Sequence, residues 1–147
     1  MTDSVEIKTP TEARSRIMSS VKQKNTAPEL MVRSCLHRLG YRFRINRRDL
    51  PGSPDIVLPK WKAVIFVHGC FWHRHKDCSR TTTPKTNTEF WERKFQANVL
   101  RDQRKLDELN LLGWKTAIIW ECDVIKSPEA ATITALKLLG ITIQVNH

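Results

Sequence analysis

Three histidines lie close together in the chain, at His68, His73 and His75, directly after an apolar segment. Packing rarely explains such a cluster, because hydrophobic cores seldom take several imidazoles. A neutral imidazole can accept a proton from water or donate one to a leaving oxygen near neutral pH. In an extended backbone His73 and His75 point to opposite sides, so that one can bind a metal while the other faces a substrate. The segment therefore predicts acid/base chemistry beside a metal site.

Cysteines on both sides of these histidines predict a structural zinc site. Cys70, His75 and Cys78 supply three ligands within a short segment, and Cys122 follows a predicted strand from which it can reach the same loop. Four Cys and His ligands with no open position are typical of structural zinc. Two alternatives stay open, because Asp77 is a competing ligand and Cys70 and Cys122 are also small enough to be core residues.

Carboxylates are placed to complete a catalytic centre. Asp55 follows a turn over 49–54 at the start of an apolar strand, and Mg²⁺ needs only one or two protein carboxylates. Asp102 lies on a predicted helix, where it can orient an imidazole or, alternatively, pair with Lys105 at i,i+3. Asp55 and Glu29 also have structural alternatives, as a turn residue and as the last residue of a capping box.

Aromatic residues in and near the histidine segment indicate a DNA-intercalating wedge. Phe71 and Trp72 lie inside the predicted metal-bound loop, and Trp91 opens a helix close to them in sequence. Aromatic side chains on a stiffened loop can replace base stacking worth about 1–3 kcal/mol per base. Opening a base step is easiest where the pair is already mismatched. For Trp91, a place in the core is the alternative.

The elements that must position these residues follow from apolar periodicity and capping signals, and they alternate between strand and helix. The class is therefore α/β, with a mixed sheet flanked by helices in one domain over 1–147. Expected helices cover about 9–22, 26–39, 89–112 and 127–140, expected strands cover 41–46, 56–58, 63–67, 115–120 and 141–145, and residues 68–88 are expected to be irregular.

Charge favours a polyanionic partner. The net charge is +10 and the pI about 9.9, with 11 basic against 5 acidic residues over 1–50 and an even balance after residue 100. Such asymmetry suits the neutralisation of phosphates along one part of the surface. Neither a signal peptide nor an apolar run long enough to span a membrane is found, so a cytoplasmic protein without disulfides is expected, in which Cys35 only packs.

Taken together, these motifs resemble the very-short-patch repair endonucleases, T·G mismatch nicking enzymes of the restriction-endonuclease-like superfamily. The resemblance runs from about Arg14 to Cys122 and is strongest in four segments: Leu50–Asp55, Val64–His73, Thr88–Trp91 and Gly113–Cys122. It implies hydrolysis of a phosphodiester 5′ to the mismatched thymine in double-stranded DNA. It also implies a monomer whose genetic companion is a cytosine-5 DNA methyltransferase, since the thymine arises by deamination of 5-methylcytosine.

The resemblance also implies residue roles. Asp55 and the backbone carbonyl of Val67 would hold a catalytic Mg²⁺, and His73 and Asp102 would form an acid/base pair supported by His68 and Glu29. The implied zinc ligands are Cys70, His75, Cys78 and Cys122, and the implied DNA contacts are Phe71, Trp72, Trp91, Met18, Asn98 and a basic helical arm over 1–25.

Two rival functions stay open at this point. A zinc-stabilised DNA-binding module without chemistry would explain the charge, the zinc ligands and the aromatics, but it leaves Asp55, His68 and His73 without a role. A restriction enzyme would instead cut both strands of matched DNA.

Overall fold

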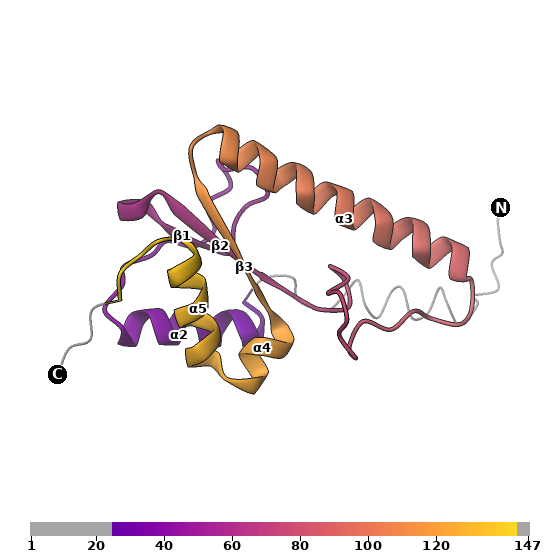
Figure 1. The fold of residues 1–147 in the computed structure, drawn as a ribbon. Helices are drawn as coiled ribbons and strands as arrows, with labels where there is room; N and C mark the ends of the chain where they lie inside the picture. The colour runs from indigo at the N-terminus through magenta and orange to yellow at the C-terminus, as the bar shows by residue number, and fades with distance from the viewer. Residues whose placement is uncertain (1–24, 144–147) are drawn as a thin grey trace.

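A computed structural model describes residues 25–143 of the protein. In it, three strands form one mixed sheet at the centre (Figure 1). Strand β1 (Ile56–Leu58) pairs antiparallel with β2 (Ala63–His68), and β2 pairs parallel with β3 (Lys115–Trp120). The short 3-10 helix η1 (Pro59–Trp61) joins the first two strands. The apolar runs of the sequence therefore predicted all three strands of the sheet.

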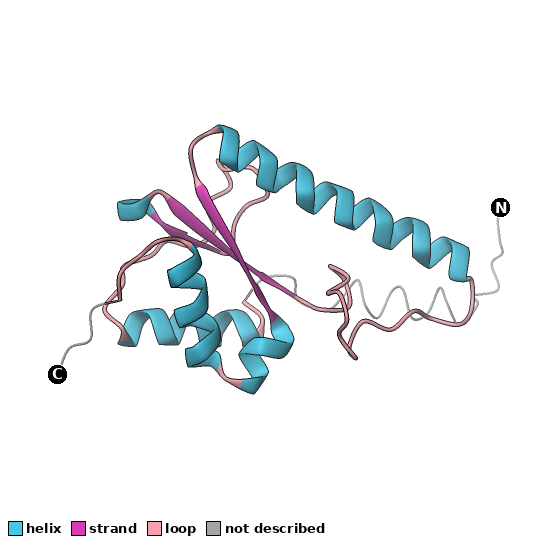
Figure 2. Cartoon of the chain, viewed as in Figure 1, coloured by secondary structure: helices cyan, strands magenta, loops and turns pink. Residues whose placement is uncertain are grey.

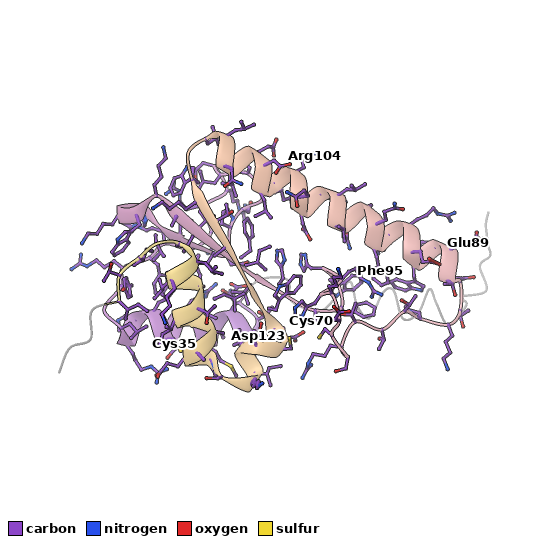
Figure 3. The ribbon with its side chains drawn as sticks, viewed as in Figure 1. Cys35, Cys70, Glu89, Phe95, Arg104 and Asp123 are labelled. Atoms are coloured by element: carbon purple, nitrogen blue, oxygen red, sulfur yellow. The ribbon has the colours of Figure 1, made fainter. Side chains whose placement is uncertain are left out.

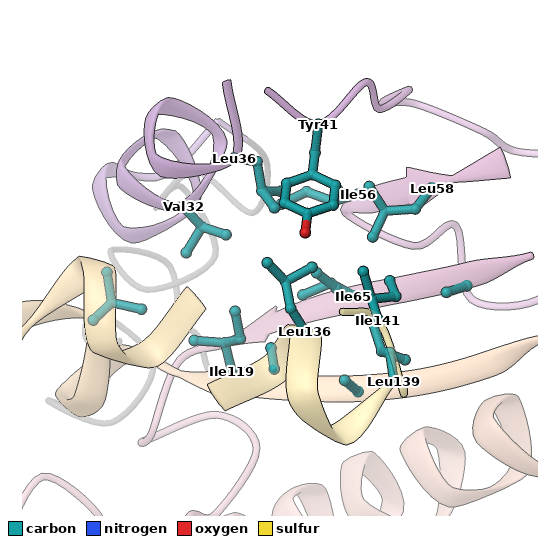
Figure 4. Close-up of a cluster of buried hydrophobic side chains, with 14 residues drawn as sticks. Val32, Leu36, Tyr41, Ile56, Leu58, Ile65, Ile119, Leu136, Leu139 and Ile141 are labelled. Carbon is teal, nitrogen blue, oxygen red and sulfur yellow. The ribbon is translucent and has the colours of Figure 1, made fainter. Parts of the chain in front are cut away.

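Helices cover both faces of this sheet (Figure 2). Helices α2 (Ala27–Arg38), α4 (Glu121–Lys126) and α5 (Pro128–Leu138) pack on one face, and α3 (Thr88–Leu111) packs on the other. Successive strand residues alternate between the two faces. The main core, drawn in Figure 4, is made of Val32, Leu36, Tyr41, Ile56, Leu58, Ala63, Ile65, Ala117, Ile119, Val124, Ala135, Leu136, Leu139 and Ile141.

The opposite face of the sheet carries a smaller core beneath α3, formed by Leu50, Val57, Val64, Phe66 and Leu109. Only the C-terminal half of α3 packs on this core. A helix of this length spans about 36 Å, so its N-terminal half runs past the sheet, as Figure 2 shows. That half covers the irregular loop that leaves β2, and thus α3 holds the loop against the end of the sheet.

Local signals set the helix bounds as expected. Thr26 caps α2, with its side chain accepting a hydrogen bond from the Glu29 backbone N–H, and Pro28 occupies the first turn. Ser127 caps α5 in the same way. Cys35 is buried on α2, as its place on the apolar face predicted.

Three elements differ from expectation. Residues 41–46 form no strand but a single bridge between Arg44 and Val57, because Asn46 adopts a left-handed backbone (φ +59°) that turns the chain away. Residues 141–143 are not a strand, and Ile141 instead packs in the main core. Helix α4 was not predicted, since its six residues are too few to show a helical period.

Some sequence predictions lie outside the described residues. They are the helix over 9–22, Met18, nearly all of the arm over 1–25, and Val145. Within residues 25–143, no helix is long and apolar enough to cross a membrane.

Candidate functional site

One end of the sheet gathers most of the predicted site residues. Asp55 directly precedes β1, and because β1 and β2 are antiparallel, it lies at the same end of the sheet as Val67 and His68. Strand β3 runs parallel to β2 and pairs Trp120 with His68. The loop that carries His73 starts at this same end.

His73 and Asp102 are brought into hydrogen-bond contact between that loop and α3. The distance from His73 Nδ1 to Asp102 Oδ2 is 2.6 Å, and both side chains are half-buried. An ionised carboxylate only accepts hydrogen bonds, so Nδ1 carries the proton and Nε2 keeps a lone pair. Among the ion pairs of residues 25–143, Asp102 has His73 as partner and not Lys105, the alternative that the sequence left open.

The charge state of Asp102 follows from this contact. Burial by itself would raise the pKa of Asp102, but the hydrogen bond and the positive charge of His73 outweigh it and hold the pKa below its ordinary value. Asp102 is therefore a carboxylate at neutral pH, fit to orient the imidazole and to stabilise it when protonated.

His68 lies directly against His73. The two rings stack with centroids 3.7 Å apart and planes 7° apart. Only 6% of His68 is exposed, and burial, assisted by repulsion from His73, lowers its pKa to about 3. Its Nδ1 is buried without a hydrogen-bond partner in the described part of the chain. His68 is thus neutral near pH 7 and acts through its shape and hydrogen-bonding atoms.

His68, His73 and Asp102 have their ligand atoms close enough together to suggest a metal site. The ring geometry argues against this reading. A metal lies in the plane of each imidazole that binds it, and two rings stacked almost parallel share no such plane. The three side chains are better arranged to move protons than to hold a cation.

The Asp55 carboxylate is fixed against the end of β2. Its Oδ2 accepts a hydrogen bond of 2.7 Å from the backbone N–H of Val67. Asp55 is half-buried, and so is Val67. This contact brings together the two residues predicted to bind Mg²⁺, and a carboxylate oxygen and a backbone carbonyl are the hard oxygen donors that Mg²⁺ prefers.

Glu29 is buried at the start of α2, with 2% of its surface exposed. Its carboxylate accepts hydrogen bonds from the Asn25 backbone N–H and the Arg33 guanidinium. Half of the capping box is present, since the Glu29 N–H donates to the Thr26 hydroxyl, but the Glu29 carboxylate accepts from Asn25 rather than from the Thr26 N–H. These contacts give Glu29 a structural role at the start of α2.

The four predicted zinc ligands come together. Their ligand atoms all lie within 4.8 Å of one another, from Cys70, His75 and Cys78 in the loop and Cys122 in α4. His75 Nδ1 is 3.6 Å from Cys70 Sγ and 3.4 Å from Cys122 Sγ. Asp77 is exposed and outside this cluster; its left-handed backbone (φ +56°) instead turns the chain between His75 and Cys78.

The thiols of this cluster have unequal acidities. Burial raises the pKa of Cys70 to about 12 and also raises that of Cys122, whereas a hydrogen bond from the Arg80 backbone lowers that of Cys78 to about 7. The Cys70 and Cys122 thiols, which are hard to ionise alone, would lose their protons when a cation binds, so the donor set fits zinc. Figure 3 labels Cys70 in the loop that follows β2, apart from Cys35 on α2.

The predicted wedge aromatics form one cluster under the N-terminal half of α3. Phe71 and Trp72 are half-buried, with ring centroids 5.2 Å apart. Trp91 is fully buried, 6.3 Å from Trp72 and 5.7 Å from Phe95. Of the two predictions for Trp91, the place in the core therefore describes this structure, and of the three predicted wedge residues only Phe71 and Trp72 keep some exposed surface.

Two polar residues tie this cluster to the helix. The guanidinium of Arg74 lies 3.9 Å from the Phe95 ring centroid, and it donates hydrogen bonds to the Thr82 carbonyl and the Thr83 hydroxyl. Asn98, predicted to contact DNA, is half-buried and donates a hydrogen bond of 3.5 Å to the Trp72 carbonyl. Both contacts limit the motion of Phe71 and Trp72.

Comparison with known proteins supplies the family. The sequence model described as DNA mismatch endonuclease Vsr matches residues 6–80. The chain is 50% identical over 113 residues to the type II nicking enzyme V.XorIIP of Xanthomonas oryzae, covering 77% of this chain and 82% of that protein. It is 42% identical over 123 residues to the DNA mismatch endonuclease Vsr of Escherichia coli, covering 84% and 78%.

This chain belongs to the Vsr family. It is therefore a DNA endonuclease of mismatch repair, as the resemblance of its motifs indicated. Membership in the Vsr family also favours an enzyme over a binding module without chemistry. The matched residues 6–80 contain Asp55, the three clustered histidines and three of the four zinc-type ligands.

Sequence reasoning missed two residues of this Vsr-family site, Arg74 and Trp120. The role of Arg74 could not be predicted, because its stacking partner Phe95 is distant in sequence. Trp120 could have been found, because alternation along β3 places it on the same face as Ile118, the face that α3 covers.

Proposed function

We propose that this Vsr-family protein nicks one strand of duplex DNA on the 5′ side of the thymine in a T·G mismatch, by Mg²⁺-dependent hydrolysis on a restriction-endonuclease-like fold. The observation that carries the proposal is the His73–Asp102 hydrogen bond at the end of the sheet where Asp55 lies. An oriented imidazole beside a carboxylate suited to Mg²⁺ is what phosphodiester hydrolysis requires.

Asp55 and the backbone carbonyl of Val67 would hold the Mg²⁺. When bound there, the cation would neutralise charge on the scissile phosphate and make water a better nucleophile. Asp55 itself is held in place by the Val67 backbone N–H, so its carboxylate keeps one orientation. That rigidity supports a role in positioning the phosphate.

His73 supplies the proton transfer in this proposal. With Nδ1 hydrogen-bonded to Asp102, the lone pair of Nε2 can take a proton from the attacking water or, once protonated, return one to the leaving oxygen. His68 holds the imidazole plane by stacking, and its low pKa keeps a second positive charge out of the pair. Glu29 would support the site indirectly, through the start of α2.

Recognition of the mismatch is assigned to the aromatic cluster and the basic arm. Phe71 and Trp72 would enter the base stack at the weakened T·G step, with Trp91 as a rigid base beneath them. Asn98, Met18 and the arm over 1–25 would contact the DNA as well, where basic side chains neutralise phosphates. The zinc bound by Cys70, His75, Cys78 and Cys122 would keep the loop folded.

The biological setting follows from the substrate. A T·G mismatch arises when 5-methylcytosine is deaminated, so we infer a genetic link to a cytosine-5 DNA methyltransferase. We also infer that a monomer suffices, because every proposed catalytic residue comes from one chain.

A strand-resolved nicking assay tests the proposal. Duplexes with one T·G pair, labelled differently on each strand, are incubated with protein and Mg²⁺ beside a T·A duplex. We expect one nick, in the thymine strand of the mismatched duplex alone. Asp55→Asn should abolish nicking and spare binding, whereas the control Asp49→Asn, an exposed carboxylate paired with Arg47, should nick normally.

Other products would refute specific parts of the proposal. Cleavage of both strands in the T·A duplex would identify a restriction enzyme. Tight binding of the T·G duplex without any nick would identify a binding module. Undiminished nicking by Asp55→Asn would remove the proposed metal ligand.

A further inference from the structure

Trp120 at the end of β3 touches both the zinc-type cluster and the catalytic histidines. One face of its indole stacks on the His75 ring, with centroids 4.2 Å apart and planes 9° apart. It also meets the ring of His68 edge to face, at 5.4 Å and 74°. His75 and His68 therefore contact the same indole.

These contacts join two sites that are otherwise separate. His75 belongs to the zinc-type cluster with the three cysteines, and its Nδ1 lies near Cys122 Sγ. His68 stacks on His73, which is hydrogen-bonded to Asp102. Each step in the series from His75 through Trp120 and His68 to His73 is a ring contact of defined geometry. Such a series transmits a displacement, because packed rings have few alternative arrangements.

Trp120 does not serve as an ordinary core residue. It is half-buried and belongs to neither hydrophobic cluster of residues 25–143. Among residues 25–143, the rings that Trp120 contacts are both imidazoles. The backbone pairing of Trp120 with His68 fixes the position of the Trp120 Cα, and the stack on His75 fixes the plane of the indole.

We propose that Trp120 is a positioning residue that uses the folded zinc loop as an anchor to hold His68, and through it His73, in the orientation needed for strand cleavage. The proposal rests on the proposed function, in which His73 transfers the proton. Zinc occupancy then affects catalysis as well as folding, because an ordered His75 ring is the surface on which Trp120 rests.

Loss of the indole should therefore lower turnover more than substrate binding. Trp120→Ala leaves a space beside both imidazoles, and a displacement of about 1 Å in a catalytic group can cost on the order of 100-fold in rate. We expect kcat for T·G nicking to fall by about 10–100-fold, with KM and duplex affinity within about threefold. Trp120→Phe, which keeps an aromatic ring, should recover most of kcat.

The test combines kinetics with two measurements that do not depend on activity. Zinc content by elemental analysis should stay at the wild-type value in Trp120→Ala and Trp120→Phe. In imidazole nitrogen NMR spectra the His73 signals should shift in Trp120→Ala, although His73 does not touch the indole. The matched control is Trp61→Ala, a half-buried tryptophan at the opposite end of β2, which should leave kcat and the His73 signals unchanged.

The outcomes separate this proposal from the proposed function. If wild-type protein nicks and Trp120→Ala keeps kcat within twofold, the positioning role is refuted and the function stands. If Trp120→Ala loses zinc and duplex affinity along with kcat, the indole is merely structural and the proposal is again refuted. If wild-type protein does not nick, the function fails, and unshifted His73 signals in Trp120→Ala would refute the positioning role independently.

Discussion

Replacing Asp102 by Asn tests the acid/base pair most sharply, because it changes one hydrogen bond without changing size. The Asn amide group would donate to His73 Nδ1, whereas the carboxylate accepts from it at 2.6 Å. His73 would then carry its proton on Nε2, the atom that must accept one. The substitution therefore removes the base form of the imidazole while leaving its position intact.

The expected magnitude follows from two contributions. A hydrogen bond to a charged group contributes about 1.5–3 kcal/mol, and each 1.4 kcal/mol is about tenfold in rate, so Asp102→Ala should lower kcat about 10–150-fold. Asp102→Asn adds the wrong tautomer, and the same exchange in hydrolases with an Asp-oriented histidine lowers kcat by about 10⁴-fold. Asp102→Asn should thus be the slower of the two.

Single-turnover nicking of a labelled T·G duplex measures this order of rates. Asp107→Asn is the matched control, since Asp107 is exposed on the same helix and accepts a hydrogen bond from Gln103. The control should nick at the wild-type rate. A rate for Asp102→Asn within threefold of wild type, or clearly above that of Asp102→Ala, would refute the reasoning about the tautomer.

Three further predictions concern the metal cluster, the buried imidazole and the aromatic base. Cys78→Ser, or chelation of zinc, should lower the melting temperature and raise amide hydrogen exchange over residues 69–87 more than in strands β1 to β3. An equal rise in exchange over residues 69–87 and in the strands would contradict this prediction. His68 has a folded pKa of about 3, below its unfolded value of about 6.5, so its contribution to stability is present above pH 6.5 and is lost as the pH falls toward 3. In urea titrations at decreasing pH, the unfolding free energy should therefore fall more steeply for wild type than for His68→Asn, and parallel curves would refute the assignment. Trp91→Ala should reduce the unfolding free energy by about 3–5 kcal/mol, whereas Trp72→Ala should chiefly weaken T·G binding; the reverse pattern would make Trp91 the wedge.

Local signals explain why the elements of the site could be read from the sequence. The apolar runs at 56–58 and 63–67 predicted the neighbouring strands β1 and β2, and their antiparallel pairing brings Asp55 beside Val67, a pair that the family resemblance implied. The capping residues Thr26 and Ser127 set helix starts that depend on a single turn of chain. In each case the signal that predicts the element is a short segment of sequence.

The missed features depend on tertiary contacts. The plane of Trp120 is set by His75, which is distant in sequence, and the burial of Trp91 is set by the loop that folds beneath α3. The expected strand over 41–46 failed because alternation does not reveal that Asn46 turns the chain. The competing ligand Asp77 could not be excluded from sequence, because only its left-handed backbone shows that it forms a turn between His75 and Cys78.

A crystal structure with a T·G duplex and Mn²⁺ in place of Mg²⁺, read by anomalous scattering, tests the central claim most directly. The account predicts a manganese peak bound by the Asp55 carboxylate and the Val67 carbonyl, facing the same phosphate as the His73 imidazole. A peak among His68, His73 and Asp102, or a phosphate out of reach of His73, would contradict it.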